Sequence, residues 1–340
     1  MERIKLGNTG LKASKLGFGA MHLPKVSVEE SDRLLNRALD MGINYIDTAR
    51  AYQDSEEKVG RVVSKRRNEC IITTRSHTWK MGIESYKKDF ETSLKTLKVD
   101  RIDFYGLHSV NKKEELDMVM GKHLEFLKKA KEKGDIGHLL ISGHNHITMT
   151  EAVKTGEFEM AFFPFNVIEK EPLDMLIEEA NRRNVITVVM KPLGGGVIPH
   201  IPLALSFFLS YNVDLIVPGV ASLKELEENF RVIEENKKLT KSELEKLEKS
   251  VEVLGKDFCR RCSYCQPCQS NIMIPFIHGI HQRCYGKPMD ENIEYMLNTM
   301  GKRLLPSLKT CTECGQCEEQ CPYNLPTRQR IKDIISMVTA

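Results

Sequence analysis

The sequence predicts a (β/α)8 TIM barrel followed by a small, mainly helical domain. Two observations predict the barrel: β-rich runs alternate eight times with longer helical patterns within residues 15–236, and these runs are continuously apolar, as buried parallel strands are. The third observation is a change at Lys256, where cysteine, proline, glutamine and asparagine become frequent. We therefore expect a barrel over residues 1–255 and a second domain over residues 256–340. An open, doubly wound sheet is the weaker alternative for the first part.

The first four strand and helix pairs are expected within residues 15–134. Each pair is a short β-rich run, such as "INYIDTA", followed by a longer helical pattern, such as "SEEKVGRVVSKRR". The strands are predicted at 15–21, 43–49, 70–76 and 102–110, and the helices at 28–42, 55–67, 82–100 and 113–134.

The second half of the barrel continues the same pattern, with "VITVVMKP" and "DLIVPGV" as its last two strands. A polar helix is expected after it at 241–255, and we find no low-complexity segment or long linker before the cysteine-rich part. The strands are predicted at 138–144, 160–166, 185–192 and 214–220, and the helices at 148–156, 171–184, 201–212 and 223–236.

Composition and charge favour a protein that acts on small molecules. The formal net charge is +3, and 29% of the residues are charged against 41% that are hydrophobic. These values give no electrostatic reason to expect nucleic acid or a membrane as partner. No apolar run approaches the roughly 20 residues that cross a bilayer, and the start "MERIKLGNTG" lacks the apolar core of a signal peptide. We therefore expect a cytoplasmic protein.

Eight of the ten cysteines lie in two short segments, "CRRCSYCQPC" and "CTECGQCEEQCP". In a reducing compartment this distribution favours metal over disulfides, whereas Cys70 and Cys284 are expected to be ordinary buried thiols. The second segment matches the C-x2-C-x2-C-x3-C-P run of iron–sulfur proteins; the first has one residue fewer before its last cysteine, and Gln269 replaces the proline. Eight thiolates suffice for two [4Fe–4S] clusters, and structural zinc is the alternative. The expected ligands are Cys259, Cys262, Cys265, Cys268, Cys311, Cys314, Cys317 and Cys321.

The two segments resemble those of two-cluster bacterial ferredoxins. The resemblance implies that each cluster takes three cysteines from one segment and its fourth from the other. Crossed ligands of this kind would hold the small domain together. One set would be Cys259, Cys262, Cys265 and Cys321, and the other Cys311, Cys314, Cys317 and Cys268.

In a (β/α)8 barrel, chemistry takes place where the strands end. The expected strand ends are rich in titratable and hydrogen-bonding side chains, so together they form a candidate site, although any one of them taken alone could be an ordinary structural residue. They are His22, Asp47, Tyr52, Arg75, His77, His108, Ser142, His144 and Asn166.

The segments "GINYIDTARAY", "IDFYGLHS" and "IVPGVASLKELEEN" resemble the aldo-keto reductase superfamily over residues 1–235, and the cysteine-rich part resembles members with a C-terminal ferredoxin-like domain. The resemblance implies reduction of an aldehyde or ketone with NADPH, or the reverse oxidation. It makes Tyr52 the proton donor, with Asp47 beside it, and His108 the residue that orients the carbonyl. Arg75 stands where the family has a lysine, and arginine is planar, bulkier and effectively always protonated.

The resemblance also implies a nucleotide site at the loops after the seventh and eighth strands, where "PLGGGV" and "PGVAS" let backbone amides approach an anion. Gly219 and Glu225 stand where the family has cations for the 2′-phosphate, so NADPH and NADH remain equal alternatives, and Ser222 with Glu225 also reads as a helix capping box. Phe162 replaces a glutamine that hydrogen-bonds the nicotinamide. The expected cofactor contacts are Ser142, Gly194, Gly195, Gly219, Lys224, Glu228 and Asn229.

Three functions are compatible with these residues. The first is an oxidoreductase that exchanges hydride between NAD(P)H and a small carbonyl compound or alcohol, with clusters that sense redox state or pass electrons to a ferredoxin-like partner. The second is an electron-transfer or regulatory module whose barrel has lost reductase chemistry. The third is a metal-dependent enzyme in which His22, His77, His108, His144 and His146 converge on zinc.

Overall fold

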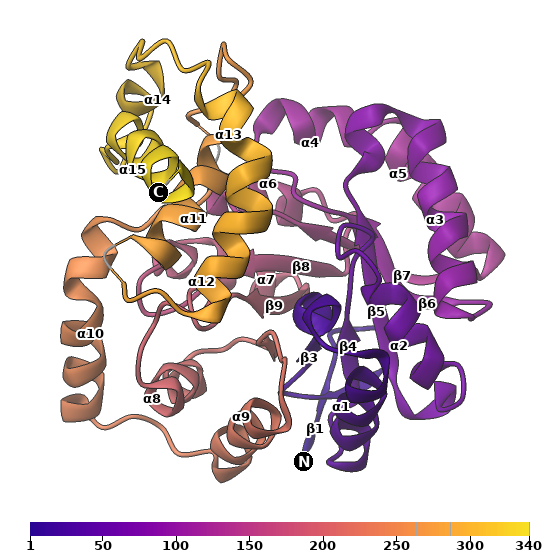
Figure 1. Cartoon of the computed structure of the whole chain (residues 1–340). Coiled ribbons are helices and arrows are strands. Elements are labelled where there is room, and N and C mark those ends of the chain that lie inside the picture. Colours follow the sequence, from indigo (N-terminus) through magenta and orange to yellow (C-terminus); the bar gives the residue numbers. More distant parts are fainter. Residues whose placement is uncertain (263, 286, 340) are drawn as a thin grey trace. The chain divides into compact units, whose positions relative to one another are not determined.

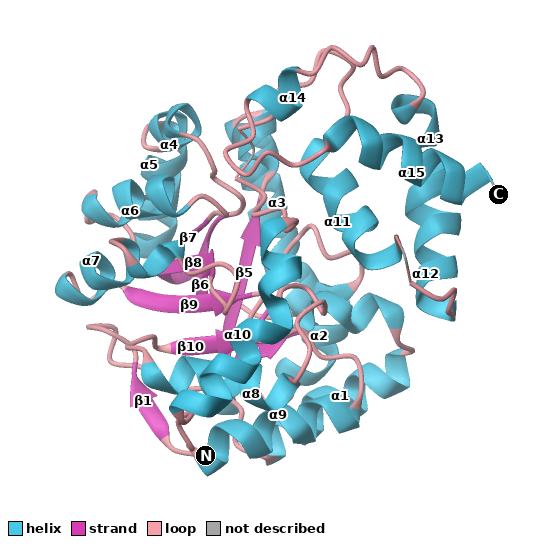
Figure 2. Ribbon diagram, turned by 90° about the vertical axis from the view of Figure 1, so that its left-hand side faces the viewer, coloured by secondary structure: helices cyan, strands magenta, loops and turns pink. Residues whose placement is uncertain are grey.

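Eight parallel strands form one sheet in the first part of the chain, with helices packed outside it (Figures 1 and 2). The computed structural model describes residues 1–262, 264–285 and 287–339. Strands pair in chain order, and isolated bridges join Leu16 to Ile216 and Gly19 to Gly219, so the sheet returns on itself. The predicted (β/α)8 fold is confirmed. The strands are β3 Phe18–Gly19, β4 Tyr45–Asp47, β5 Ile71–Ser76, β6 Ile102–Leu107, β7 Ile136–Ser142, β8 Met160–Pro164, β9 Ile186–Met190 and β10 Leu215–Val217.

The interior of the barrel is filled by large apolar side chains that point inward from alternate strand positions. Tyr45, Phe104 and Phe162 are fully buried there. An N-terminal hairpin of β1 (Arg3–Lys5) and β2 (Lys12–Ser14) adds residues to the same cluster. The hairpin thereby covers the end of the barrel where the strands begin, and the opposite end, where the strands finish, is left for the candidate site.

Helices of the barrel begin and end at ordinary caps. Ser27 and Asn145, for example, accept hydrogen bonds from the first backbone amides of α1 and α6. The expected single helix at 113–134 is wrong, because Gly121 leaves helical geometry (φ −89°, ψ −120°) and separates two helices. The α-helices are α1 Val28–Asp40, α2 Ser55–Val63, α3 Ile83–Leu97, α4 Lys113–Val119, α5 Lys122–Lys133, α6 His146–Lys154, α7 Leu176–Arg182, α8 Ile201–Ser206 and α9 Leu223–Glu235; the 3-10 helices are η1 Ala20–Lys25, η2 Arg67–Glu69, η3 Thr78–Met81, η4 Glu171–Leu173 and η5 Phe207–Ser210.

The chain divides into two compact units, Met1–Lys249 and Ser250–Ala340, and the division falls within α10 (Lys241–Lys256). The predicted boundary at Lys256 stays a prediction. The second unit is helical and has its own apolar core, which includes Ile277 and Ile334. None of the helices in the described residues is long and apolar enough to cross a membrane. The remaining helices are α11 Ile274–Cys284, α12 Glu291–Met296, the π-helix η6 Leu297–Gly301, α13 Lys302–Leu308, α14 Gln316–Glu319 and α15 Thr327–Thr339.

Candidate active site and cysteine-lined cavities

A cavity of about 280 Å³ opens where the barrel strands end. Its polar side is lined by Asp47, Tyr52 and Arg75, and its other walls come from the loops after β9 and β10. The cavity therefore brings three of the four predicted catalytic residues together with the predicted nucleotide loops. The fourth, His108, follows β6 and lies next to Tyr52, with 6.0 Å between the two ring centroids.

Arg75 is held on two sides inside the barrel. It points inward from β5 and forms a two-point ion pair with Asp47, in which Nη1 approaches one carboxylate oxygen closely and Nη2 lies 3.3 Å from the other. Its guanidinium carbon lies 4.4 Å from the centroid of the Phe162 ring, within the range of a cation–π contact. Both members of the ion pair are almost fully buried, so the guanidinium is fixed in place rather than free to move.

The Arg75 guanidinium also reaches the Tyr52 hydroxyl, with 3.2 Å between Nη2 and Oη. A guanidinium can only donate, so the phenol oxygen accepts this hydrogen bond and its own proton is free to bond another acceptor. Burial raises the pKa of Tyr52 above its ordinary value near 10, against the lowering by Arg75. Tyr52 is therefore a protonated phenol at neutral pH, and the guanidinium of Arg75 places a positive charge beside its oxygen.

Burial and the partner's charge have opposite effects on the pKa of each member of this ion pair. Burial raises the pKa of Asp47, and the guanidinium of Arg75 opposes that rise. Burial alone would lower the pKa of Arg75, but the charges of Asp47 and Tyr52 raise it above its ordinary value. Arg75 thus remains a cation at every pH of interest and cannot itself deliver or take a proton.

His108 stands edge-on to Tyr52, with an angle of 90° between the rings. Burial, followed by the charges of Arg75 and His77, lowers the pKa of His108 well below its ordinary value, so the imidazole is neutral. Its Nδ1 has no hydrogen-bond partner within the described part of the chain. The backbone at this point is fixed by Trp79, whose Nε1 donates to the His108 carbonyl at 2.9 Å. A neutral, buried imidazole next to a phenol can orient a small polar ligand without competing for the proton.

The predicted cofactor residues divide into two groups. Gly195, Gly219, Glu228 and Asn229 line the cavity. Close packing explains Gly219, because a Cβ there would lie 3.2 Å from the His22 ring. The predicted residues that are not among those lining the cavity are Ser142, Gly194 and Lys224.

Ser142 has a structural task of its own in the barrel. Its hydroxyl donates to the Leu107 carbonyl at 3.1 Å and accepts from the Ser109 amide at 3.2 Å, which ties the end of β7 to the end of β6. These two bonds account for its burial without a ligand.

The start of α9 is capped by the two residues that the sequence singled out. Ser222 accepts from the Glu225 amide at 3.2 Å, and the Glu225 carboxylate accepts from the Ala221 amide at 2.7 Å. The arrangement differs from a standard capping box in that the Glu225 carboxylate accepts from the residue before the N-cap Ser222. Glu225 also lines the cavity, so a carboxylate stands at a position where the resemblance implies a cation.

Sequence reasoning missed Lys191, which follows β9 directly and lines the cavity. Its Nζ lies 2.9 Å from His144 Nε2, and its backbone adopts a left-handed conformation with φ of 56°. The signal was present, because Lys191 lies near the end of the strand predicted at 185–192, and strand ends are where the other candidate residues stand. Within the described residues, no three His, Cys, Asp or Glu side chains gather as a site for a single metal ion, and the five barrel histidines form no such group.

The eight cysteines of the two segments line two neighbouring cavities, each of which draws thiols from both segments. All ten cysteines of the chain are unbridged. A four-iron cluster needs thiolates spread around it, because each of its irons binds one, whereas the ligands of a single metal ion must converge on one point. The thiols that line one cavity are Cys259, Cys262, Cys265, Cys317 and Cys321, and those that line the other are Cys265, Cys268, Cys311, Cys314 and Cys317.

The thiols of the first cavity disturb one another electrostatically. Burial, followed by the neighbouring Cys259, Cys262 and Cys321, raises the pKa of the Cys265 thiol to about 12. Several thiolates can be buried together only when a cation compensates their charge. Soft, clustered and otherwise uncompensated sulfur donors suit iron, so the residues present fit an iron–sulfur group.

Comparisons with known proteins agree with both units. The aldo/keto reductase family model matches residues 15–200, and a 4Fe-4S dicluster domain model matches residues 258–326. An uncharacterized oxidoreductase of Bacillus subtilis, YqkF, is 26% identical over 257 residues, which are 69% of this chain and 81% of that protein. L-galactose dehydrogenase of Arabidopsis thaliana is 27% identical over 242 residues, 66% of this chain and 72% of that protein.

Among solved structures, the holo form of aldo-keto reductase AKR11C1 from Bacillus halodurans superposes with a TM-score of 0.64 at 24% identity, covering 74% of this chain and 96% of that one. This likeness shows a shared fold.

Proposed function

The chain belongs to the aldo/keto reductase family, and from this premise we propose that its barrel reduces a small carbonyl compound by hydride transfer from NADH or NADPH, or runs the reverse oxidation. The chain is an oxidoreductase of that family with a 4Fe-4S dicluster domain. The observation that carries the proposal is the contact of Arg75 with the Tyr52 hydroxyl inside the cavity at the barrel mouth.

In the proposed mechanism, the chain's own residues handle the proton. A nicotinamide held in the cavity would supply the hydride that the carbonyl carbon takes up. As negative charge develops on the carbonyl oxygen, the O–H bond of Tyr52 breaks and its proton passes to that oxygen. Arg75 stabilises the phenolate that remains, and the neutral imidazole of His108 orients the carbonyl. Asp47 holds Arg75 in place through the two-point ion pair.

The residues around the cavity fit a nucleotide. We propose that Gly195 and Gly219 let backbone amides approach its phosphates and that Glu228 and Asn229 contact its base. Ser142, Gly194 and Lys224 stay part of the proposed site as supports or outer contacts, since they do not line the cavity. The capped carboxylate of Glu225 favours NADH, because a 2′-phosphate next to it would meet like charge.

A binding titration tests this proposal. We expect NADH to bind and quench the fluorescence of the protein, and NADPH to bind more weakly. Glu225→Gln should reduce the difference between the dissociation constants of the two nucleotides. If neither nucleotide binds the iron-loaded protein, the barrel does not carry reductase chemistry. The chain would then act as an electron-transfer or regulatory module, which the buried apolar ring of Phe162 at the nicotinamide-amide position also favours.

We propose that the second unit holds two [4Fe–4S] clusters with crossed ligands, one on Cys259, Cys262, Cys265 and Cys321 and the other on Cys268, Cys311, Cys314 and Cys317. The two cavities support this assignment because each contains one such set. The clusters pass single electrons to a ferredoxin-like partner or sense redox state. Ten unbridged thiols favour a reducing compartment such as the cytoplasm.

Replacing one crossed cysteine tests the ligand sets. We expect Cys321→Ser to lower the iron content from about eight to about four atoms per chain, since one cluster loses a ligand and the other keeps its four. Visible absorbance near 400 nm would fall by about half. Cys284→Ser is the control, because this buried thiol lies outside both sets, and it should leave iron content unchanged. An unaltered iron content in Cys321→Ser would remove that cysteine from the ligands.

The pH dependence follows from Tyr52. Because its pKa is raised above the ordinary value near 10, the protonated form that reduction needs predominates at all lower pH. We expect the turnover rate of carbonyl reduction to be constant through the neutral range and to fall only above about pH 10. The reverse oxidation needs the phenolate of Tyr52, so the rate of oxidation should rise over the range above about pH 10 in which the rate of reduction falls. A reduction rate that halves between about pH 6 and pH 8 would assign the proton to another group.

A further inference from the structure

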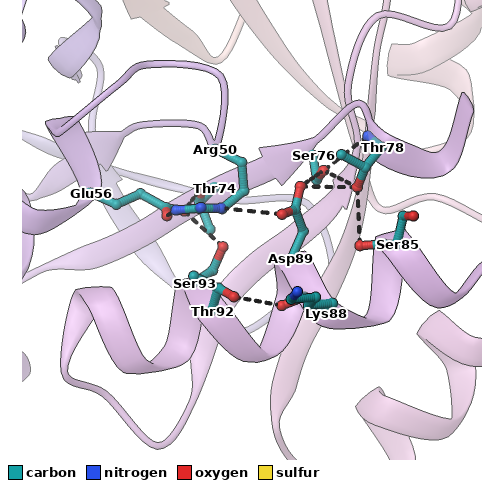
Figure 3. Close-up of polar contacts among 10 residues, drawn as sticks. All are labelled: Arg50, Glu56, Thr74, Ser76, Thr78, Ser85, Lys88, Asp89, Thr92 and Ser93. Carbon is teal, nitrogen blue, oxygen red and sulfur yellow. Dashed lines mark hydrogen bonds and ion pairs between the residues drawn. The ribbon is translucent and has the colours of Figure 1, made fainter. Parts of the chain in front are cut away.

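A polar network lies on the outer side of β5, between that strand and the helices α2 and α3 (Figure 3). Its centre is Arg50, whose guanidinium lies between the carboxylates of Glu56 and Asp89. The proposed mechanism uses none of these three residues, and sequence reasoning gave no sign of them as a group.

Glu56 is the most buried of the three charged residues, with 1% of its surface exposed. Its Oε2 accepts from Arg50 Nη1 at 2.5 Å, and its Oε1 accepts from the Thr74 and Ser93 hydroxyls at 2.7 and 2.8 Å. A carboxylate taken out of water needs partners of this kind, and those of Glu56, which itself lies on α2, come from α3, β5 and the loop after β4. Glu56 thus joins four segments at one point.

Asp89 forms the second half of the network. It accepts from the Ser76 hydroxyl at 2.5 Å and from the Thr78 hydroxyl at 2.9 Å, and its Oδ1 lies 3.6 Å from Arg50 Nε. Arg50 therefore links a carboxylate on α2 to one on α3.

The network forms hydrogen bonds with the β5 residues on either side of Arg75. Side chains alternate along a strand, so Thr74 and Ser76 point out of the barrel while Arg75 points in. Glu56 holds the first of these outward hydroxyls and Asp89 holds the second. The backbone amide of Arg50 donates to the carbonyl of Arg75 itself at 3.1 Å. Arg75 is thereby fixed from outside at three consecutive residues.

The same network holds the loop that carries Tyr52. Arg50 and Glu56 lie on the two sides of Tyr52 in the chain, and both are anchored to β5. Gln53, next to Tyr52, has φ of 45°, a left-handed conformation that costs a non-glycine residue energy and persists only when its surroundings impose it. The relative position of Tyr52 and Arg75 therefore depends on anchors that lie behind both of them.

We propose that Arg50, Glu56 and Asp89 are positioning residues that hold the hydroxyl of Tyr52 within hydrogen-bond reach of Arg75. The inference rests on the proposed function for its catalytic meaning. At 3.2 Å the contact between Nη2 and Oη has little room to lengthen before it is lost. A shift of about 1 Å in either partner costs an enzyme of this kind up to about a hundredfold in rate.

The test uses the full chain loaded with iron and labelled with ¹³C at the hydroxyl-bearing carbon of tyrosine. Nine tyrosines give nine signals, and Tyr52→Phe identifies the one from Tyr52. We expect Glu56→Gln and Asp89→Asn each to shift that signal while the other tyrosines distant from the network keep theirs. For a carbonyl substrate found by screening aldehydes and ketones with NADH, the turnover number should fall at least about tenfold with the KM for NADH unchanged.

Two controls separate positioning from general loss of stability. Val59→Ala removes buried volume from α2 without changing a residue of the network. Arg61→Met, also on α2, breaks an exposed ion pair with Asp32 of α1. Neither should shift the Tyr52 signal. If Val59→Ala shifts it as much as Glu56→Gln at equal loss of unfolding free energy, or if Glu56→Gln leaves it in place, the proposal is wrong. The signal is read without any substrate, so a failure of the proposed reaction leaves this test intact.

Discussion

Tyr52→Phe is expected to lower carbonyl reduction by about a hundredfold to ten-thousandfold, because it removes the proton donor together with the oxygen that accepts a hydrogen bond from Arg75. Phenylalanine keeps the ring that stands edge-on to His108, so the shape of the cavity is preserved. The nucleotide contacts that we propose lie on the loops after β9 and β10 and on α9 rather than on Tyr52. We therefore expect the dissociation constants for NADH and NADPH to stay within about twofold of the starting protein.

The measurement is a pair of assays on the same preparation: steady-state turnover of an aldehyde, and nucleotide binding by fluorescence. Trp79→Phe is a useful companion, since it removes the hydrogen bond to the His108 carbonyl but no proton donor. It should have a smaller effect on turnover than Tyr52→Phe. Unchanged turnover in Tyr52→Phe would exclude this residue as the acid.

Arg75→Met is expected to have the largest effect on stability. The substitution leaves Asp47 buried without its cation, and breaking one side of a buried ion pair costs about 3–5 kcal/mol in the free energy of unfolding. A proton can neutralise the isolated carboxylate, so the loss should be smaller at pH 5 than at pH 7. Chemical denaturation at both pH values measures it.

The double variant Arg75→Met with Asp47→Asn is the decisive comparison. It removes both charges, so much of the lost stability should return, although Tyr52 still lacks its cationic neighbour. If the single and double variants are equally destabilised, packing on Phe162 rather than charge explains the role of Arg75. Arg75→Lys keeps the charge and, under the proposed chemistry, should hold or raise reductase activity.

Much of the barrel could be predicted because its signal is local. β-Rich runs such as "CIITTRS" predict strands, and β5 runs over Ile71–Ser76, buried on both sides, as expected. The division of 113–134 into two helices was hidden, since Gly121 is tolerated in many helices and only its backbone angles show the break.

The sequence predicted which residues of the candidate site stand at strand ends. It did not predict which side chains contact one another. Asp47, Tyr52 and Arg75 follow from their positions in the chain. The stacking of Arg75 on Phe162 depends on two strands that are not neighbours in sequence, and no periodicity reports it. The same holds for Glu56, which reads as a solvated helix residue because "SEEK" is charged, yet its side chain points inward onto β5.

The sharing of each cysteine-lined cavity between two distant segments has a consequence for how the protein is made. Under the proposed ligand sets, both clusters need thiols from the segment that ends at Cys321. One cluster cannot be completed before Cys317 has left the ribosome and the other not before Cys321, whereas the barrel strands are all synthesised much earlier and can fold first. Under these ligand sets, iron would be inserted only after the barrel has been translated, and the second unit would reach its final fold last.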